Sequence, residues 1–236
     1  MRKQDKIFEK GNVSGLPFSF NQEVTEVFED MIDRSVPGYN TTLKIIQQQA
    51  KIHSIDRSNI YDLGCSIGAS TFSLLNALNG RSNIIAIDNS EPMVRSCTER
   101  FSKYIKAGQV NFLKEDISNS EITNASIVVI NFVLQFLGIK ERGDLMHKIY
   151  EGLVPGGILI LSEKVHFDSK KQTEEISNIH HSFKTTNGYS KLEISSKRDS
   201  LEGILITETE SQHLDRAKEI GFKASTKLMS NLNFLT

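Results

Sequence analysis

The sequence predicts an α/β fold with a mostly parallel, seven-stranded sheet and helices on both faces. Apolar segments of strand length, such as residues 83–88 and 125–134, alternate along the chain with amphipathic segments of helical length. A glycine-rich turn, from Asp62 to Gly68, directly follows the first strong strand segment. Because neighbouring parallel strands need a long crossover, usually a helix, this alternation indicates a parallel sheet with right-handed connections.

We expect one domain over residues 1–236, because a chain of 236 residues fits a single α/β unit. Two helices are predicted ahead of the sheet, within about residues 20–54. The first covers 22–33, where apolar residues recur at helical spacing, and the second covers roughly 39–53. The Pro-Gly turn in SVPGYN separates the two helices.

The elements of the sheet are expected to follow in alternation. They are the strands 58–63, 83–88, 109–116, 125–134 and 157–165, with helices over 69–79, 91–106 and 141–153. Residues 168–202 interrupt this rhythm, because the segment is polar and is predicted to be helical over 169–184 and 189–202. An insertion near the carboxyl ends of strands commonly covers a site, so we expect a cap there. A helix over 211–222 and one or two edge strands within 222–236 follow.

Composition and charge narrow the function classes. The chain has 28 Lys and Arg against 29 Asp and Glu, so it lacks the basic excess typical of proteins that hold nucleic acid through phosphates. No apolar run reaches the roughly 18 residues of a membrane span, and the charged start MRKQDKIFEKGN lacks the apolar stretch of a signal peptide. Cys65 and Cys97 are expected to be reduced thiols. We therefore expect a cytoplasmic protein without direct nucleic-acid or membrane contacts.

Three features fall at the carboxyl ends of successive predicted strands, where open α/β sheets bind ligands. The first is D-x-G-x-x-x-G at 62–68, whose glycines allow the backbone to approach a ligand closely. The second is Asp88, whose carboxylate can accept hydrogen bonds from both hydroxyls of a ribose. The third is Asp116-Ile117, where a carboxylate can accept from an exocyclic amine of adenine. One nucleoside would span all three strand ends.

The spacing of the glycines indicates which nucleoside. A dinucleotide fold would favour G-x-G-x-x-G, and a P-loop would need G-K-[ST]; neither is present. The turn at 62–68 instead resembles motif I of the Rossmann-like class I methyltransferases, and LVPGGILILSE at 153–163 resembles a late motif of that superfamily. The resemblance implies S-adenosyl-L-methionine. No metal is expected, because His180-His181 lacks further ligands at a recognisable spacing.

The methyl acceptor is not evident from the residues. The [DN]-P-P-[YF] motif that methylates amino groups of bases would lie at 131–134, where the chain reads NFVL, and no Pro-Cys pair is present. A conventional methyltransferase acting on tRNA or a small molecule stays open, as does a non-catalytic nucleoside-binding protein. Glu163-Lys164, at the end of a predicted strand, has two alternatives, a local ion pair or a catalytic role.

Longer blocks give a more specific resemblance. They are VFEDMIDRSVPGY, YDLGCSIGAS, IIAIDNS, VVINFVLQFL, KIYEGLVPGGILILSEK and HHSFKTTNGYSKLEISSKR. From about residue 7 to 222 the chain resembles the carboxy-S-adenosyl-L-methionine synthase family. The resemblance implies that prephenate loses carbon dioxide and hydroxide to give phenylpyruvate. The deprotonated sulfonium methyl captures the carbon dioxide, and the product serves the synthesis of 5-oxyacetyluridine at the tRNA wobble position.

The same resemblance implies the site residues. Arg198 matches the family arginine that holds the new carboxylate, and is expected to be both catalytic and cofactor-binding; a helix-surface arginine is the alternative. The other cofactor-contacting positions are Tyr39, Gly64, Cys65, Ser66, Asp88, Asn89, Asp116, Ile117 and Asn131. The family implies a homodimer and leaves open whether Arg198 acts in its own subunit or across the interface. The family's long aromatic last strand is not matched here, which predicts a shortened edge strand.

Overall fold

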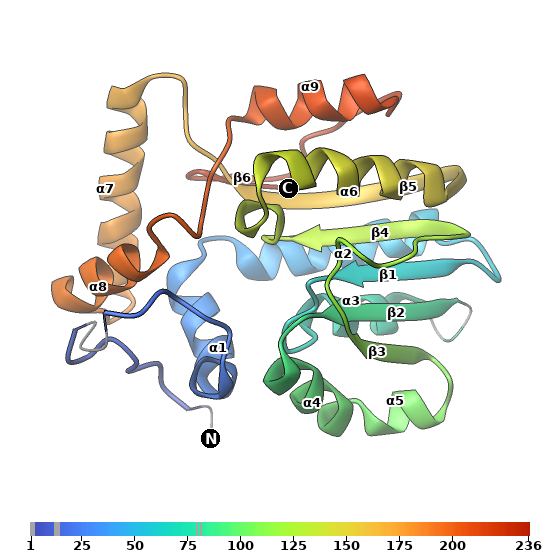
Figure 1. The fold of residues 1–236 in the computed structure, drawn as a ribbon, viewed down its shortest axis with the longest axis horizontal. Coiled ribbons are helices and arrows are strands. Elements are labelled where there is room, and N and C mark those ends of the chain that lie inside the picture. The colour runs from blue at the N-terminus through green and yellow to red at the C-terminus, as the bar shows by residue number, and fades with distance from the viewer. Residues whose placement is uncertain (1–2, 12–14, 79, 81) are drawn as a thin grey trace.

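The computed structural model describes residues 3–11, 15–78, 80 and 82–236. Within them lies a seven-stranded sheet with the strand order β3-β2-β1-β4-β5-β7-β6 (Figure 1). Its strands are β1 (Asn59–Leu63), β2 (Asn83–Asp88), β3 (Val110–Lys114), β4 (Ala125–Asn131), β5 (Leu153–Lys164), β6 (Ser230–Asn231) and β7 (Phe234–Leu235). The first five are parallel to one another, whereas β7 is antiparallel to β5 and β6. The predicted α/β fold class is confirmed.

Helices cover both faces of this sheet. They are α1 (Gln22–Ser35), α2 (Tyr39–His53), α3 (Ala69–Leu78), α4 (Glu91–Arg100), α5 (Ser102–Lys106), α6 (Ile139–Gly152), α7 (Lys170–Thr186), α8 (Lys191–Leu201) and α9 (Glu210–Ile220), with a 3-10 turn, η1 (Leu134–Phe136). On one face Leu74 of α3 packs in a cluster with Ile127. On the other face Leu145 of α6 packs in a cluster with Val128. Ile127 and Val128 are consecutive in β4, and successive side chains of a strand point to opposite faces.

The prediction of one continuous helix over 91–106 is wrong, because the helix is broken at Phe101. Phe101 is buried, and its ring lies against the glycine-rich turn, where a Cβ added to Gly68 would come within 2.6 Å of Phe101 Cε2. Packing of this ring therefore takes precedence over helix continuity between α4 and α5. The helix predicted over 69–79 is α3, and its last predicted residue lies outside the described residues.

The strand predicted over 125–134 ends earlier, at Asn131. Phe132 has a φ of +62°, in the left-handed region that non-glycine residues rarely adopt. The chain then turns into η1. Its first N–H groups donate to the side chain of Glu163 in the neighbouring strand β5, and not to backbone carbonyls of that strand. An apolar run alone did not indicate this turn, because its residues remain partly or fully buried after the strand stops.

The last strands also differ in length from the prediction. β5 begins at Leu153 rather than at residue 157, because Leu153 already pairs with Ala125 before the register shifts. At the far edge only Glu163 and Lys164 pair with β7, and β6 and β7 have two residues each. The edge strands are therefore short in this chain, and their shortening relative to the family stays a prediction.

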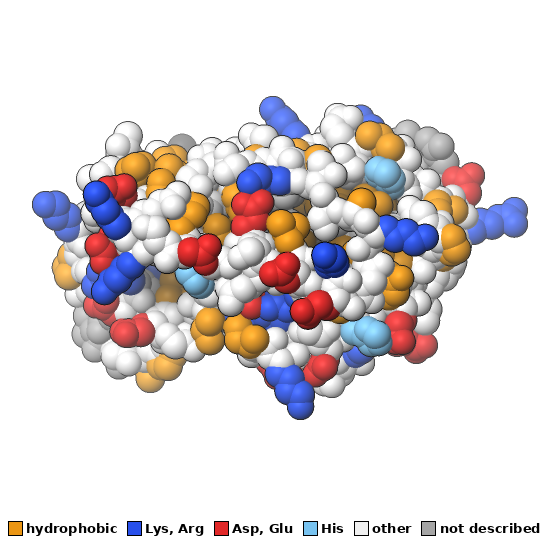
Figure 2. Space-filling view, turned by 90° about the horizontal axis from the view of Figure 1, so that it is seen from above, with side chains coloured by type: hydrophobic (Ala, Val, Ile, Leu, Met, Phe, Trp, Pro, Cys, Tyr) orange, Lys and Arg blue, Asp and Glu red, His pale blue; other side chains and the backbone are white. Residues whose placement is uncertain are grey.

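The polar insertion forms α7 and α8, close to the predicted bounds 169–184 and 189–202. Figure 1 shows α1, α7 and α8 at the end of the molecule toward which the arrowhead of β4 points, the carboxyl edge of the parallel sheet. Within the described part of the chain, no helix is long and apolar enough to cross a membrane. On the face seen in Figure 2, basic and acidic side chains are interspersed.

Candidate active site at the carboxyl edge of the sheet

The glycine-rich turn is folded onto the end of β2. The backbone N–H groups of Gly64 and Cys65 both donate to the Ile87 carbonyl, at 2.8 and 2.9 Å. Gly64 has a φ of +73°, and a Cβ there would lie 2.5 Å from Cγ2 of Val133. Only glycine fits this contact without displacing Val133, so the turn lies directly against the residues that follow β4.

Asp88 joins this turn to the helix that follows β2. Its Oδ2 accepts from the Ser66 N–H at 2.8 Å, and its Oδ1 accepts from the Ser90 N–H at 2.9 Å. The side chain is buried, and this burial raises the pKa of Asp88 while the two N–H donors oppose the rise. A carboxylate has about four lone-pair sites, so acceptor capacity remains for the hydroxyls of a ligand.

Asp62 lies beneath the turn rather than at its surface. Thr71 Oγ1 of α3 donates to Asp62 Oδ2 at 2.6 Å, and burial raises the pKa of Asp62 to about 7. This contact fastens the start of α3 to β1, so Asp62 supports the turn from inside. Tyr39, at the start of α2, is half-buried, and desolvation raises the pKa of its hydroxyl. Its ring centroid lies 6.3 Å from that of Phe132.

Asn131, at the end of β4, carries an unsatisfied acceptor. Its Nδ2 donates to Ser70 Oγ at 3.0 Å, whereas its buried Oδ1 has no hydrogen-bond partner among the described residues. Buried polar atoms in folded proteins are nearly always paired. A donor group of a ligand at the mouth of the turn would satisfy Oδ1.

The remaining predicted positions of this group lie at the ends of β2 and β3. Asn89 is exposed directly after Asp88, and the Glu115 N–H donates to the Asp88 carbonyl at 3.1 Å. Asp116 is exposed, and its Oδ1 accepts from the Ser118 N–H at 2.9 Å. The structure thus gathers nine of the ten predicted site residues around the ends of β1 to β4, including the buried Cys65 and Ile117. Their binding roles stay predictions.

Arg198 is not gathered with the other nine. It lies in α8 of the cap, its side chain is 65% exposed, and its Nη2 contacts Oδ1 of the adjacent Asp199 at 3.1 Å. Burial is the main cause that lowers the pKa of His181 and of Lys184, and repulsion by the charge of Arg198 adds to it, so Arg198 lies near these basic side chains of α7. The predicted role of Arg198 on a new carboxylate stays a prediction.

The segment that contains Phe18 and Phe20, directly ahead of α1, covers the ends of the strands. Ser90 Oγ donates to the Phe20 carbonyl at 2.6 Å, and the Phe18 N–H donates to the Ser200 carbonyl of α8 at 2.8 Å. The Phe20 ring lies edge-on to Phe136 of η1, with centroids 5.3 Å apart. The segment therefore connects the cap to the end of β2 across the sheet edge.

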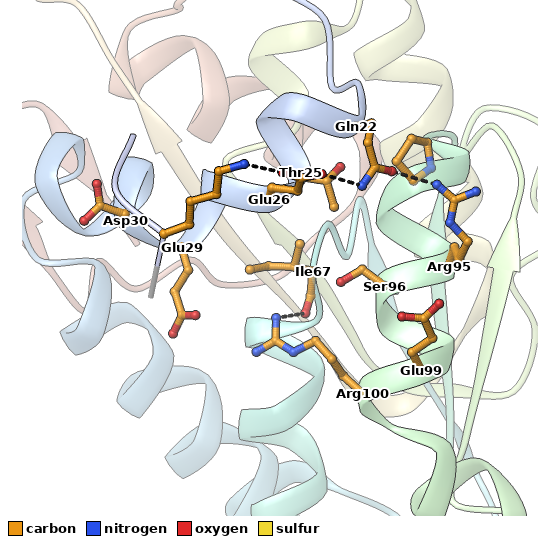
Figure 3. A pocket seen from close by; sticks show the side chains of 12 residues that line it. Gln22, Thr25, Glu26, Glu29, Asp30, Ile67, Arg95, Ser96, Glu99 and Arg100 are labelled. Atoms are coloured by element: carbon orange, nitrogen blue, oxygen red, sulfur yellow. Dashed lines mark hydrogen bonds and ion pairs between the residues drawn. The ribbon is translucent and has the colours of Figure 1, made fainter. Parts of the chain in front are cut away.

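Two cavities of the described structure lie away from these residues. One, of about 420 Å³, opens between α1, Ile67 and α4 and is lined mainly by charged and polar side chains (Figure 3). The other, of about 1030 Å³, lies along the outer edge of β5 beside α9. None of the predicted site residues lines either cavity. We place the site at the strand ends, because nine of the ten predicted residues come together there.

Glu163 is a positioning residue whose role the sequence did not indicate. Its buried carboxylate accepts from the N–H groups of Val133 (3.1 Å), Leu134 (2.8 Å) and Gln135 (3.1 Å). It thereby holds the turn that presses Val133 against Gly64. The alternative of a Glu163–Lys164 ion pair is wrong, since the carboxylate is occupied by the backbone. An acid within an apolar strand was the only sequence signal.

Metal ligands are not grouped in the described residues, where no three His, Cys, Asp or Glu side chains come together. His180 instead packs in the cap: its Nε2 lies 2.7 Å from the Ser35 carbonyl and its ring lies against Phe234. The expected absence of a metal stays a prediction.

Comparisons with known proteins can now be set beside this geometry. Residues 60–157 match the family described as "Methyltransferase domain". A carboxy-S-adenosyl-L-methionine synthase of Shewanella piezotolerans is 44% identical over 232 residues, which cover 98% of this chain and 96% of the relative. The chain belongs to the carboxy-S-adenosyl-L-methionine synthase family. The family resemblance found in the sequence is thereby confirmed.

Another carboxy-S-adenosyl-L-methionine synthase, from Hydrogenovibrio crunogenus, is 46% identical over 217 residues, covering 92% of this chain and 86% of the relative. The fold of the family member described here is also similar to more distant solved structures. One is magnesium protoporphyrin IX methyltransferase from Synechocystis PCC 6803 with bound SAH, at a TM-score of 0.61 and 15% identity. The match covers 87% of this chain and 83% of that one. This likeness confirms the methyltransferase-type fold.

Proposed function

We propose that this chain converts S-adenosyl-L-methionine and prephenate into carboxy-S-adenosyl-L-methionine and phenylpyruvate. The observation that carries the proposal is the identity of 42–46% over nearly the whole chain to relatives named carboxy-S-adenosyl-L-methionine synthase. In the balanced reaction, prephenate releases carbon dioxide and hydroxide. Hydroxide takes a proton from the sulfonium methyl, and that carbon forms a bond to the carbon dioxide. No protein base is required in this scheme.

The residues present fit S-adenosyl-L-methionine. The unpaired Oδ1 of Asn131 offers an acceptor for the ammonium group of the methionine part. Asp88 retains acceptor capacity for the ribose hydroxyls. Exposed Asp116, at the end of β3, is available for the adenine amine. These contacts would hold the ligand along the ends of β1 to β4.

The protein's further contribution is exclusion of water. A carbanion next to a sulfonium centre is quenched by any proton donor, so the site must be closed during the reaction. The segment of Phe18 and Phe20, hydrogen-bonded to Ser200 and Ser90, covers the strand ends from one side, and the cap adjoins it. This arrangement supports a reaction that traps carbon dioxide rather than one that hydrolyses its substrate.

The wider context forms part of the same proposal. The product would serve as carboxymethyl donor for 5-oxyacetyluridine at the tRNA wobble position, without direct binding of this chain to nucleic acid. The balanced charge, 28 basic against 29 acidic residues, supports this indirect role. We further propose a homodimer in the cytoplasm. The buried, free thiols of Cys65 and Cys97 accord with a reducing compartment.

The test is to incubate the purified protein with S-adenosyl-L-methionine and prephenate and to measure the products by mass spectrometry. We expect a species heavier than the starting sulfonium compound by one carboxyl group, together with an equal amount of phenylpyruvate. Omission of prephenate should abolish both. Formation of S-adenosylhomocysteine with a methylated acceptor, or a carboxylated product without prephenate, would instead support a conventional or different transferase.

A further inference from the structure

Two lysines lie at the junction of the sheet edge and the cap. Lys164 is the last residue of β5, two positions beyond Ser162, which is the register partner of Asn131. Lys184 lies in the last turn of α7, one helical turn beyond His180. Both side chains are only half-exposed. The sheet and the cap therefore each contribute one ammonium group to the same region.

Aromatic contacts connect this region to the cofactor positions. Ring centroids are 6.3 Å apart between Tyr39 and Phe132, 5.7 Å between Phe132 and Phe234, and 5.1 Å between Phe234 and His180. The Nζ of Lys164 lies 5.9 Å from the centroid of Phe234. A continuous packed path thus runs from Tyr39, beside the end of β4, to the cap helix that carries Lys184.

Neither ammonium group has a polar partner in the part of the chain that the structure describes. Among the described residues, no hydrogen bond or ion pair reaches Nζ of Lys164 or Lys184, and the contact of Lys164 with Phe234 is near the limit of a cation–π interaction. Desolvation lowers the pKa of Lys164, and it lowers the pKa of Lys184 to about 7, with further lowering by the charges of Lys197, Lys164 and Arg198. No acidic side chain is among the groups that act on Lys184.

Lys197, in the same cap, is a buried lysine whose ammonium group does have protein partners. It is hydrogen-bonded to Ser35 Oγ at 3.4 Å, and the carboxylate of Asp5 acts on its pKa in the stabilising direction. Lys197 is thus part of the structure that holds α8 to α1. Lys164 and Lys184 lack such a partner among the described residues, although a half-buried, unpaired ammonium group lowers stability. An anion bound between them would remove that cost.

We propose that Lys164 and Lys184 bind the carboxylates of the organic co-substrate, and that this pair of ammonium groups, called the pocket below, takes a dicarboxylate. The inference rests on the proposed function, in which prephenate is a dianion. A sulfonium ligand bound along β1 to β4 would place its positive charge next to this pocket. The carboxylate of the co-substrate bound to the lysines and the sulfonium methyl would then lie close together. Two separated ammonium groups select a dianion over a monoanion such as phenylpyruvate, which favours substrate entry and product release.

The test compares Lys164→Met and Lys184→Met with the matched control Lys171→Met, which removes an exposed charge from the first turn of α7. Steady-state kinetics with both substrates should show the KM for prephenate raised about 10- to 100-fold in each pocket variant, the loss expected for one charged hydrogen bond. The KM for S-adenosyl-L-methionine should stay within about twofold, and Lys184→Arg should recover most of the affinity because it restores the charge.

A second measurement separates the pocket from the reaction. Calorimetric titration with glutarate, a stable dianion, should show binding to the wild-type protein and to Lys171→Met, and binding about 10-fold or more weaker to each pocket variant. Wild-type protein that binds glutarate through these lysines but makes no carboxylated product would overturn the proposed function and retain the pocket. A functioning enzyme whose KM for prephenate is the same in all variants would overturn the pocket alone.

Discussion

The two halves of the candidate site are built in opposite ways. At the nucleoside half, around the ends of β1 to β3, Asp88 is fixed by backbone N–H donors from Ser66 and Ser90. At the cap half, Lys164 and Lys184 have no partner among the described residues, and Arg198 is exposed and paired with its sequence neighbour. The first half holds its geometry without a ligand. The second half has charges that only a ligand or a further contact would satisfy.

This difference corresponds to two tasks. In the proposed reaction the nucleoside part is common to substrate and product, and rigid acceptors cost no ordering energy when it binds. The organic anion of that proposal would occupy the cap half, whose unpaired charges are stabilised when an anion is bound. We therefore expect substitutions in the nucleoside half to affect S-adenosyl-L-methionine, and substitutions in the cap half to affect the carboxylates.

The largest expected effect is that of Asp88→Ala. It removes an acceptor for two ribose hydroxyls and frees the Ser66 and Ser90 N–H groups, so affinity for S-adenosyl-L-methionine should fall about 100-fold or more. Titration calorimetry measures this directly. The control is Asp144→Ala, which removes an exposed carboxylate of α6. An Asp88→Ala protein that keeps its affinity while remaining folded would contradict the placement of the nucleoside half.

The nucleoside half was predictable because its parts are local in sequence. The strand, the turn from Asp62 to Gly68 and the helix α3 follow one another directly, and the glycines mark close backbone approach. The end of β4 was not predictable, because the residue that sets it, Glu163, lies about 30 positions away from the N–H groups it accepts from. Apolar pattern could not distinguish a buried turn from a buried strand there.

The cap half was predictable only as a helical insertion. Lys164 and Lys184 come from different elements, and the ring of Phe234, from the far end of the chain, lies between Lys164 and His180. No fixed spacing in the sequence expresses that arrangement. Arg198 was found by its resemblance to a family position. Its side chain is exposed because of the side of α8 on which it lies. The weak amphipathic pattern of α8 did not indicate that side.

Arg198→Leu should produce the next largest effect. If Arg198 holds the new carboxylate, affinity for carboxy-S-adenosyl-L-methionine should fall about 10- to 100-fold, the loss of one charged hydrogen-bonded pair. Affinity for S-adenosyl-L-methionine, which lacks that carboxylate, should stay within about twofold. Binding of both compounds is measured by calorimetry, with Arg95→Leu, an exposed arginine of α4, as the charge-matched control. Equal product affinity in wild type and Arg198→Leu would remove Arg198 from the site.

The smallest expected effect is a pH dependence of the cap half. The pKa of Lys184 is lowered from 10.5 to about 7, so the free enzyme loses this charge as the pH rises through 7. Because a dianion binds the protonated form, the KM for prephenate should rise above that pH, by up to about tenfold per pH unit for one linked proton. The facing groups are Lys164, Lys197, Arg198 and His181. Of these, Lys197 has a pKa lowered to about 8 and would extend the rise.

Lys184→Arg distinguishes this linkage from a general effect of pH. Arginine stays charged throughout the range, so the rise in the KM for prephenate should be much smaller in this variant between about pH 6 and pH 9. The pH dependence of the KM for S-adenosyl-L-methionine should be the same in both proteins, since Lys184 belongs to the other half. His181 does not account for a rise above pH 7, because burial and then the neighbouring basic side chains lower its pKa from the ordinary value of 6.5. An identical rise in the KM for prephenate in wild type and Lys184→Arg would show that the charge of Lys184 does not bind the substrate. Of the two lysines, only Lys164 would then remain in the proposed site.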